Sequence, residues 1–398
     1  MPEHLAPGVF VEETSFQSRP IQGIDTTTAA FVGPTRKGPW GWRPRLLTSL
    51  VDFQRIYGGF AELRVSGPPE LRRNHVAHAV QAYFANGGRR LYVARTRPNR
   101  TRTLPTPADY AAALATLRSL VDLSTVAAPG YSVRRASDPA AWSEIQGQLV
   151  AFAEQAGTYR FAVLDAPPAS TVEVIRAVRS QLDSSHAALY YPWVTVANPL
   201  AGTSSKQPPT LDLPPSGFLC GIYAVTDVNR SVSQAPANAV IVGALGLEQA
   251  LTQGQQELLN PEGVNCLRHF EGKGNLVWGA RTVSSDPEWK YVNVRRYFNY
   301  LEGSIDRGTQ WVVFEPNGEA LWAALRRAIE DFLAGEWRRG SLVGTKPAEA
   351  FFVRCDRSTM TQSDLDQGRL VCLIGVAPLR PAEFVLFHLG QWTADRSA

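Results

Sequence analysis

The sequence predicts a multi-domain chain of mixed α+β and α/β class. Three observations lead to this prediction. Helical patterns alternate with near-continuous apolar strand patterns between about residues 105 and 250, which is typical of a mainly parallel sheet covered by helices. The pattern changes near residue 260, where two amphipathic helices and several β-rich runs begin. A short, isolated β-prone run lies close to each end of the chain.

The length and composition set outer limits on the class of protein. At roughly 150 residues per domain, 398 residues are enough for two or three domains. Hydrophobic residues make up 44% and charged residues 19%, which excludes a chain disordered throughout. The longest apolar stretch, 239–247, is too short to span a bilayer, and the N-terminus has no secretory signal pattern. We therefore expect a soluble protein made in the cytoplasm.

The charge and the cysteines argue against several kinds of site. The net charge is +4, an excess that looks too small and too scattered for a nucleic-acid partner. Only five of the 40 cations are Lys, and Arg is better suited to bidentate pairing at interfaces. The four cysteines are far apart in the sequence and form no CxxC motif, which predicts buried reduced thiols rather than a zinc site or a redox pair.

The N-terminal quarter contains a terminal strand and a first set of core elements. After the Pro7-Gly8 turn, residues 9–13 form a short β-prone run. The core elements expected next are a buried strand at 26–33, a helix at 48–57 capped by Thr48 or Ser49, a helix at 74–86 stopped by Gly87-Gly88, and a strand at 91–95.

The middle and the C-terminal third differ in pattern. In the middle we expect helices at 108–120, 140–156 and 170–182, strands at 125–130, 160–165 and 187–196, a loop at 198–215 and a further element at 236–244. Later we expect strands at 276–278 and 311–314, helices at 291–305 and 318–333, and β-rich runs at 351–355, 370–376 and 383–389. In the helix at 318–333 an apolar face lies opposite Arg326 and Arg327.

Four short patterns resemble fragments of reactive sites, and each lacks a required partner. There is no GxSxG motif for a hydrolase, no carboxylate or Cys at ligand spacing from the histidine pair, no complete phosphate-loop motif and no EF-hand spacing. The fragments are Ser184-Ser185-His186, the pair His75 and His78, Gly272-Lys273-Gly274, and the pair Asp364 and Asp366. We therefore predict no catalytic, cofactor or metal site.

The two terminal strands are too short to be stable alone. Their residues are Val9, Phe10, Val11, Glu12 and Glu13 at one end, and Phe384, Val385, Leu386, Phe387, His388 and Leu389 at the other. They can pair with their own domain, or they can add to a sheet of another subunit, because open strand edges recruit other chains. The pattern of residues alone leaves both hypotheses open.

Several runs, taken in order, resemble the sheath proteins of contractile phage tails and related injection systems. They are Ala6-Pro7-Gly8-Val9-Phe10-Val11-Glu12-Glu13, Val277-Trp278-Gly279-Ala280-Arg281-Thr282, Trp289-Lys290-Tyr291-Val292-Asn293-Val294-Arg295-Arg296 and Trp311-Val312-Val313-Phe314-Glu315-Pro316-Asn317. The resemblance covers nearly the whole chain. Without large insertions, the chain is similar to the compact sheaths of extracellular injection particles and R-type bacteriocins.

The resemblance implies a conserved inner α+β domain, an inserted outer α/β domain and strand arms at both termini. The boundaries it implies are arms at 1–24 and 381–398, inner-domain parts at 25–100 and 256–380, and an outer domain at 101–255. The arms of neighbouring subunits would add strands to the C-terminal domain. We choose Arg326 and Arg327 as the residues that face the inner tube.

The same resemblance implies a structural, non-enzymatic protein without cofactors. It would form a helical sheath of hexameric rings around an inner tube and contract to drive the tube through a target envelope. Its partners would be itself, the tube protein, and baseplate and terminator or cap proteins, with no nucleic acid and no membrane insertion. It would assemble in the cytoplasm into a particle that can be released. The alternatives are a minor sheath paralogue that caps or initiates the sheath, another tail component, and a hydrolase.

Overall fold

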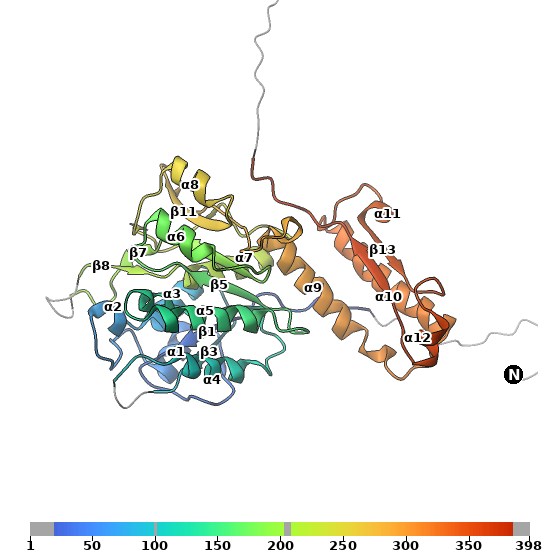
Figure 1. The fold of residues 1–398 in the computed structure, drawn as a ribbon, viewed down its shortest axis with the longest axis horizontal. Coiled ribbons are helices and arrows are strands. Elements are labelled where there is room, and N and C mark those ends of the chain that lie inside the picture. Colours follow the sequence, from blue (N-terminus) through green and yellow to red (C-terminus); the bar gives the residue numbers. More distant parts are fainter. Residues whose placement is uncertain (1–19, 99–101, 203–207, 385–398) are drawn as a thin grey trace, which may run out of the picture.

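A large α/β body and a smaller lobe are joined by the long helix α9 (Val292–Gly308) (Figure 1). The computed structural model describes residues 20–98, 102–202 and 208–384. Within these ranges no helix combines the length and the apolarity needed to cross a membrane.

The large body is built on a nine-stranded mixed sheet. Six neighbouring strands in its centre run parallel, as the alternating pattern predicts, and antiparallel strands complete both edges. In spatial order the strands are β2 (Leu46–Leu47), β3 (Leu91–Arg95), β1 (Ala29–Gly33), β4 (Thr125–Ala127), β5 (Phe161–Asp165), β6 (Ala187–Tyr191), β11 (Val264–Phe270), β12 (Gly274–Val277) and β9 (Ala239–Val240).

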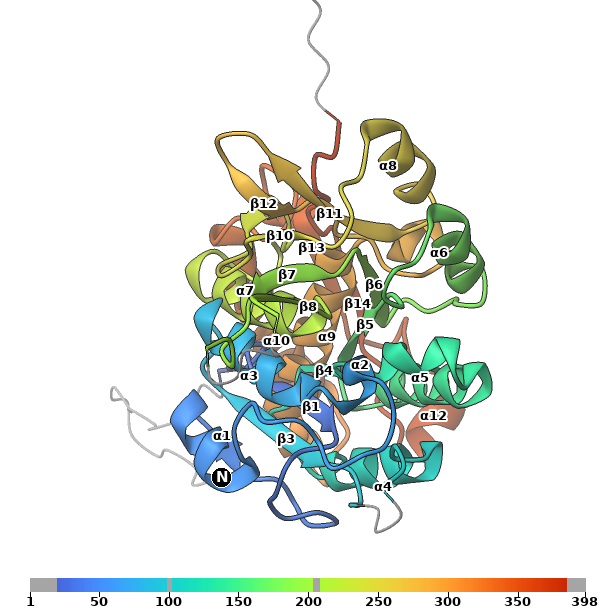
Figure 2. The same cartoon turned by 90° about the vertical axis from the view of Figure 1, so that its left-hand side faces the viewer.

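Helices cover both faces of this sheet, so the central strands are apolar on both sides. In β1, Ala29 and Phe31 face one core, and Ala30 and Val32 face the other. The first core is closed by α1 (Leu50–Tyr57), α3 (His75–Ala85) and α7 (Ser216–Asn229). The second is closed by α4 (Pro107–Leu117), α5 (Pro139–Ala153), α6 (Val172–Arg179) and α8 (Gln253–Leu259). Figure 2 shows the two layers on opposite sides of the sheet.

The sheet is continuous across two expected domain boundaries. Its strands come from all three of the segments 25–100, 101–255 and 256–380. At the second boundary, β11 pairs in parallel with β6, with Val264 opposite Leu189. Hydrogen bonding within the sheet therefore does not divide at residue 100 or at residue 255, and the visible division of the molecule lies along α9 (Figure 1).

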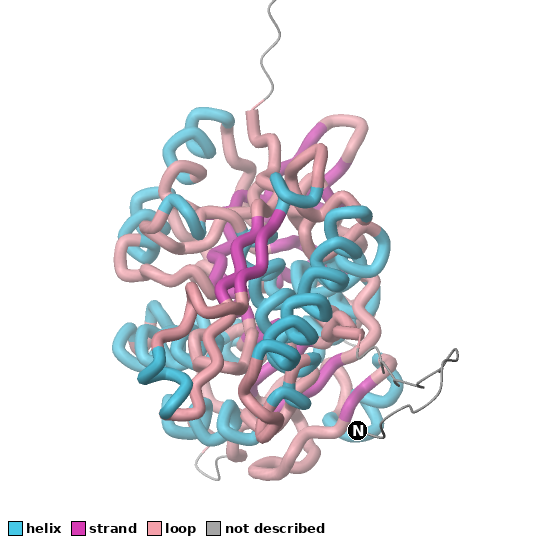
Figure 3. The backbone as a smooth tube through the Cα atoms, turned by 90° about the vertical axis from the view of Figure 1, so that its right-hand side faces the viewer, coloured by secondary structure: helices cyan, strands magenta, loops and turns pink. Residues whose placement is uncertain are grey.

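The smaller lobe packs a short antiparallel hairpin on one helix (Figure 3). The expected apolar face is confirmed in α10 (Glu319–Arg338), where Trp322, Leu325, Ile329 and Leu333 are buried. The hairpin consists of β13 (Phe351–Arg354) and β14 (Leu373–Val376), and the lobe is completed by α11 (Pro347–Ala350) and α12 (Gln362–Asp366).

Two strand predictions and one loop prediction were wrong. The expected single strand 187–196 is two strands, since β7 (Val194–Ala197) leaves the large sheet for a small one with β8 (Thr210–Leu213) and β10 (Gly246–Leu247). The expected loop 198–215 therefore contains a strand. The expected strand 311–314 is a 3-10 turn, η3 (Gln310–Val312), followed by exposed Phe314 at φ 70°.

Helix α7 was not predicted, because its Gly, Thr, Val and Tyr residues favour helices poorly. Its packing against α3 accounts for the glycines. A Cβ on Gly217 would lie 2.6 Å from Ala79 Cα, and one on Gly221 would lie 2.6 Å from the Tyr83 carbonyl oxygen. The two helix backbones are therefore nearly in contact, and only glycine fits between them.

Asp165, at the end of β5, holds the first turn of α7 in place. Its buried carboxylate accepts hydrogen bonds from the Ser216 backbone N–H and Oγ, both at 2.7 Å. Burial raises the pKa of Asp165 to about 7, although the two bonds from Ser216 act in the opposite direction.

The glycine contacts predict opposite effects for two Gly→Ala changes. Gly217→Ala should lower the free energy of unfolding by about 1–3 kcal/mol, because the added methyl overpacks the α3–α7 contact. Gly147→Ala in α5 is the matched control, since no atom beyond its own stretch of helix backbone lies within 4 Å of its added Cβ; it should raise stability by about 0.5–1 kcal/mol. Urea denaturation of the unassembled chain measures both. Equal stability of Gly217→Ala and the native chain would contradict the contact.

The raised pKa of Asp165 predicts a pH dependence. In the unfolded chain this carboxyl ionises near its ordinary value of about 4, so between about pH 4 and 7 the folded state binds the extra proton. Its contribution to stability is therefore present at low pH and is lost as the pH rises through 7. Relative to Asp165→Asn, the native chain should lose about 2–3 kcal/mol between pH 5 and pH 8. Asp366→Asn, at an exposed side chain, serves as control in the same urea titrations. If the free energy of unfolding changes with pH in the same way in the native chain and in Asp165→Asn, Asp165 does not titrate as proposed.

Candidate sheet edges and terminal anchors

Most residues of the two expected arms lie outside the described part of the chain. These residues are Val9, Phe10, Val11, Glu12 and Glu13, and Val385, Leu386, Phe387, His388 and Leu389. Phe384 is the last described residue, and 74% of its surface is exposed. The features that can be examined are the two places where the chain enters and leaves the described body, and the sheet edges that an arm could meet.

The N-terminal segment lies along α9, where small residues let it approach closely. A Cβ added to Gly308 would lie 2.8 Å from the buried Ile21 side chain, and one added to Gly303 would lie 2.5 Å from Ile24. The Ile24 backbone N–H donates to Ser304 Oγ at 3.0 Å. The chain is therefore fixed to α9 from Ile21 onward, inside the expected arm 1–24.

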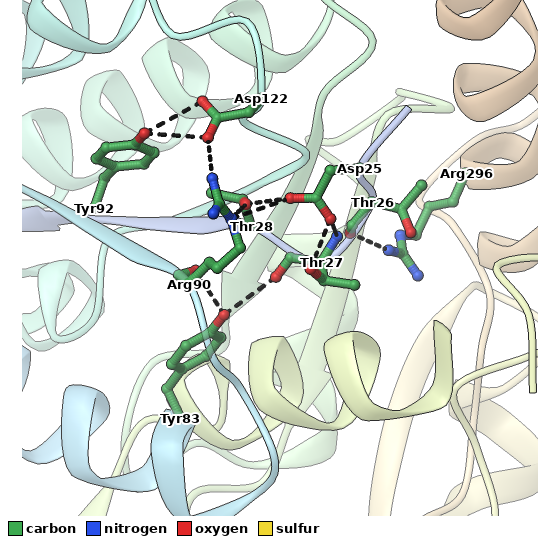
Figure 4. A network of polar contacts seen from close by, with 9 residues as sticks. All are labelled: Asp25, Thr26, Thr27, Thr28, Tyr83, Arg90, Tyr92, Asp122 and Arg296. Carbon is green, nitrogen blue, oxygen red and sulfur yellow. Dashed lines mark hydrogen bonds and ion pairs between the residues drawn. The ribbon is translucent and has the colours of Figure 1, made fainter. Parts of the chain in front are cut away.

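The next residues form a tight polar turn that leads into β1 (Figure 4). The Asp25 carboxylate accepts hydrogen bonds from the Thr27 backbone N–H at 2.9 Å, from Thr27 Oγ1 at 2.7 Å and from Thr28 Oγ1. A carboxylate that bonds the N–H two residues ahead makes an Asx turn. Arg90 lies 3.4 Å from the same carboxylate and donates to Thr28 Oγ1 at 3.0 Å.

Arg90 connects the Asp25 turn to Asp122 and Tyr92, which lie beside the second core. It donates to Asp122 at 2.8 Å, and Tyr92 Oη also contacts Asp122, at 3.1 Å (Figure 4). The hydrogen bond to Asp122 raises the pKa of Arg90, so this guanidinium stays charged. Tyr83 Oη lies 3.1 Å from the Thr27 carbonyl oxygen and 2.7 Å from that of Arg90.

A buried ion pair fastens the same segment to two helices. Arg296 of α9 and Asp227 of α7 each expose 2% of their side chains, and two hydrogen bonds of 2.6 and 3.0 Å join them. Burial raises the pKa of Asp227, and the charge of Arg296 opposes that rise. Arg296 also donates to the Thr26 carbonyl oxygen at 3.1 Å, and its guanidinium lies 4.7 Å over the Tyr223 ring. The N-terminal segment is thus held to α7 and α9 by one side chain.

A second ion pair anchors the C-terminal segment. Arg281 exposes 5% of its side chain. Its Nε and Nη2 both donate to the Glu383 carboxylate, with Nε 2.8 Å from Oε1. Its remaining nitrogen donates to the Asn260 carbonyl oxygen at 2.7 Å, and Tyr291 Oη lies 3.4 Å from Glu383. Bidentate guanidinium–carboxylate pairs are strong and directional. The chain is therefore fixed one residue before the expected arm strand.

Between β14 and this anchor the chain returns to the large body. Pro378 bridges to Leu342, and the Asn293 side-chain amide donates to the Leu379 carbonyl oxygen at 3.2 Å. Residues 381–384 then line a groove of about 630 Å³ with α8 and the β11–β12 hairpin, where Phe270 and Trp278 supply its aromatic wall.

The β13–β14 hairpin has two open edges. Within the described ranges neither outer edge pairs with a third strand. Phe352 and Leu373 expose 46% and 51% of their surfaces. A two-stranded sheet is marginal on its own, and open edges are sites where further strands add.

The structure places Arg326 and Arg327 on the outer side of α10. Arg326 lies 3.8 Å from Glu330, and both side chains are nearly half exposed, while Arg327 is exposed. An exposed pair of this kind contributes little to stability. The tube-facing role of these arginines remains a prediction.

The short patterns that resemble fragments of reactive sites serve the fold. Asp364 closes a capping box with Thr361 at the start of α12, and residues 272–274 form the β11–β12 turn. His75 and His78 are buried in α3, where burial lowers their pKa values to about 3 and about 4. No group of three or more potential metal ligands occurs in the residues with described positions.

Comparison with family models matches two consecutive parts of the chain. Residues 105–283 match the phage tail sheath protein central domain, and residues 284–390 match the phage tail sheath C-terminal domain. The chain is 25% identical to the tail sheath protein of Enterobacteria phage T4 over 180 residues, which are 44% of this chain and 26% of that protein. It is also 25% identical to a putative prophage major tail sheath protein of Pseudomonas aeruginosa, over 59% of each chain. The match thus spans about a quarter of the phage T4 protein.

Solved structures are similar over the full length. A sheath chain of the contracted extracellular contractile injection system PVC has a TM-score of 0.76 at 26% identity, with 100% of both chains covered. The contracted helical sheath of the anti-feeding prophage gives a TM-score of 0.76 at 29% identity, covering 98% of this chain and 100% of that one. A chain of the baseplate of the same particle gives 0.74 at 29% identity, with the same coverage.

The Arg281–Glu383 pair predicts that the C-terminal segment is held by charge. Glu383→Gln should raise amide hydrogen exchange at residues 378–384 by about 10- to 100-fold, because a charge-assisted bond contributes roughly 1.5–3 kcal/mol. Exchange in the β13–β14 hairpin should change little. Glu271→Gln, at an exposed position in the β11–β12 turn, is the control for loss of one charge. Unchanged exchange of residues 378–384 in Glu383→Gln would show that the pair does not anchor the segment.

Proposed function

Since the chain belongs to the phage tail sheath family, it is a contractile sheath subunit, and we propose that it assembles as stacked hexameric rings around an inner tube. Members of this family are structural proteins and not enzymes. The observation that carries the proposal is the likeness, over the whole chain, to subunits of contracted helical sheaths. On this proposal the particle assembles in the cytoplasm and belongs to a phage tail or a released tail-like system.

The terminal arms are the proposed links between subunits. Residues 9–13 and 384–389 of two neighbours would add to the two open edges of the β13–β14 hairpin. Each main-chain bond contributes roughly 0.5–1.5 kcal/mol net, so a five-residue strand supplies a few kcal/mol. The two edges and their exposed Phe352 and Leu373 support this placement.

The anchors give each arm a fixed base. Ile21 to Thr28 are fastened to α9 and β1, and Glu383 is fastened to Arg281. On this proposal the link to a neighbouring subunit begins before Ile21 at one end and after Glu383 at the other. Rings can rotate relative to one another while each link stays attached to a rigid body.

The smaller lobe is the proposed inner part, with Arg326 and Arg327 directed at the tube and the large α/β body outside. Contraction would bury more surface between subunits. About 400 Å² of extra burial per subunit corresponds to about 10 kcal/mol at about 25 cal/mol/Å², before the costs of ordering and desolvation. Summed over a sheath, this free energy would drive the tube through a target envelope without a nucleotide. The partners on this proposal are the tube, baseplate and terminator or cap proteins.

A second candidate is a minor sheath paralogue that starts or caps the sheath near the baseplate. The likeness to a chain of the anti-feeding prophage baseplate favours it. Negative-stain microscopy of the purified chain distinguishes the two, since a main sheath subunit forms long striated tubes and a minor one forms single rings or short stacks.

The arm links predict that deleting residues 1–14 abolishes long sheaths and leaves a folded chain with native circular dichroism. Val11→Pro should have nearly the same effect, since proline removes a main-chain donor from the added strand. Val11→Thr is the matched control, because it keeps a β-branched side chain and the donor. Sheaths of normal length from the truncated chain would refute the arm model.

The tube contact predicts an effect of charge reversal on α10. Arg326→Glu combined with Arg327→Glu should reduce assembly on purified inner tubes by at least about tenfold at low salt, because like charges then face each other. Co-sedimentation with tubes measures this loss. Arg338→Glu combined with Lys346→Glu, at exposed positions of the same lobe, controls for charge alone. Unreduced co-sedimentation of the first variant would exclude this face as the tube contact.

A further inference from the structure

Two cysteines that are distant in the sequence are opposite each other in the β13–β14 hairpin. Cys355 directly follows β13, and Cys372 directly precedes β14. The ladder pairs Arg354 with Leu373, so its next step places Cys355 opposite Cys372. Cys355 is 1% exposed, Cys372 is half-buried, and both are free thiols. The absence of a CxxC motif concealed this pairing in the sequence.

The hydrogen-bond pattern also gives the type of cross-strand position. The Ala377 backbone N–H donates to the Ala350 carbonyl oxygen at 2.8 Å, which makes that pair a hydrogen-bonded one. Hydrogen-bonded and non-hydrogen-bonded pairs alternate along an antiparallel ladder, so Cys355 and Cys372 form a non-hydrogen-bonded pair. Opposite Cα atoms are about 4.5 Å apart at such positions, within the range of about 4.4–6.8 Å that a disulfide spans.

We propose that Cys355 and Cys372 form a redox-controlled disulfide bond across the β13–β14 hairpin, here called the staple. The Cys372 thiolate, the more accessible of the two, attacks an external small-molecule disulfide, forms a mixed disulfide and releases one thiol. The Cys355 thiolate then attacks the Cys372 sulfur and releases the second thiol. The protein loses two protons and two electrons in total, and the external disulfide is reduced to two thiols.

Burial of the two thiols slows disulfide formation. It raises the pKa of Cys372 to about 12 and also raises that of Cys355, so the reactive thiolates are scarce near neutral pH. The pair therefore stays reduced in a reducing compartment and oxidises slowly outside it. The consequence for the sheath rests on the proposed function: the staple would stiffen the hairpin that receives the arms after release of the particle. Formation of the bond does not depend on polymerisation.

The test oxidises the purified full-length chain with glutathione disulfide and compares it with the same chain kept in dithiothreitol. We expect a mass loss of two hydrogens, a cross-linked peptide pair containing Cys355 and Cys372, and free Cys220 and Cys266. The midpoint of thermal unfolding should rise by about 3–8 °C on oxidation. Cys372→Ser should show neither change, and its native circular dichroism would show that it folds.

Three results would overturn the staple: a persistent glutathione adduct on Cys372, cross-links to other cysteines, or full retention of thiols after prolonged oxidation at pH 9. Microscopy of reduced chains tests the proposed function separately. A chain that forms the disulfide but no tubes would refute the proposed sheath function and would still support the staple.

The cationic excess is also less scattered than whole-chain counts suggest. Residues 34–103 contain fourteen Lys and Arg against three Asp and Glu, and the rest of the chain has 26 against 33. The loop at 34–45 presents Trp42, 78% exposed, and Trp40, 45% exposed, and the Arg97 guanidinium lies 5.4 Å over the Trp40 ring. Arg95 fixes this loop by donating to the carbonyl oxygens of Thr35 and Gly38.

We infer that this loop binds an acidic surface on a second copy of the chain. In the described ranges no carboxylate forms an ion pair with Lys37, Arg43 or Arg45. Exposed Trp and Arg are the residues enriched in binding hot spots. The net negative charge of the remaining sequence makes a second copy complementary to the loop. Contacts between two different surfaces of identical chains build rings or helices, as a sheath requires.

This inference rests on the proposed function and is tested by the triple variant Trp42→Ala, Arg43→Glu, Arg45→Glu. We expect sheath length to fall at least about fivefold and assembly of the variant to lose its salt dependence. Arg118→Glu combined with Lys273→Glu, at exposed positions elsewhere, is the control. Sheaths of normal length from the triple variant would overturn the inference. It would also be overturned if the triple variant assembled normally but lost DNA binding in a gel shift, because the loop would then bind nucleic acid instead. Absence of tubes from the native chain would instead refute the proposed function.

Discussion

The buried pair of Arg296 and Asp227 is the interaction on which the arrangement of the molecule depends. It joins α9 to α7, and through the Thr26 carbonyl oxygen it also holds the segment that leads into β1. Removing one partner of such a pair leaves an uncompensated buried charge, which typically costs about 3–5 kcal/mol. The N-terminal segment, α7 and α9 are therefore interdependent at one guanidinium.

The architecture was predictable where local pattern and tertiary environment agree. The parallel strands of the middle section and the apolar face of α10 follow from periodicity, and Ser49, one of the two expected caps, caps α1. Helix α7 was missed because Gly217 and Gly221 are needed for contact with α3, a requirement that local propensity cannot reveal. The pairing of β11 with β6 was not predicted, because pairing between distant strands leaves no mark in a local pattern.

The candidate site was predictable only in part. The short β-prone run at each terminus pointed to arms, and the order of several runs pointed to the family. The anchors depend on contacts between residues far apart, such as Arg281 with Glu383, which no spacing rule connects. One signal was available, since Arg281 lies within the run Val277–Thr282 that resembled the family most. That run pointed to Arg281 but not to its partner, because Glu383 lies 102 residues further along the chain.

Helix α9 contributes residues to the cores on both of its sides: Val292 packs under the sheet, and Tyr297 and Leu301 pack with α10. A seventeen-residue helix embedded in this way behaves as a stiff lever arm rather than a hinge. Torque applied to the smaller lobe would then be transmitted through α9 to the α/β body. Each subunit would then turn as one piece when a sheath contracts.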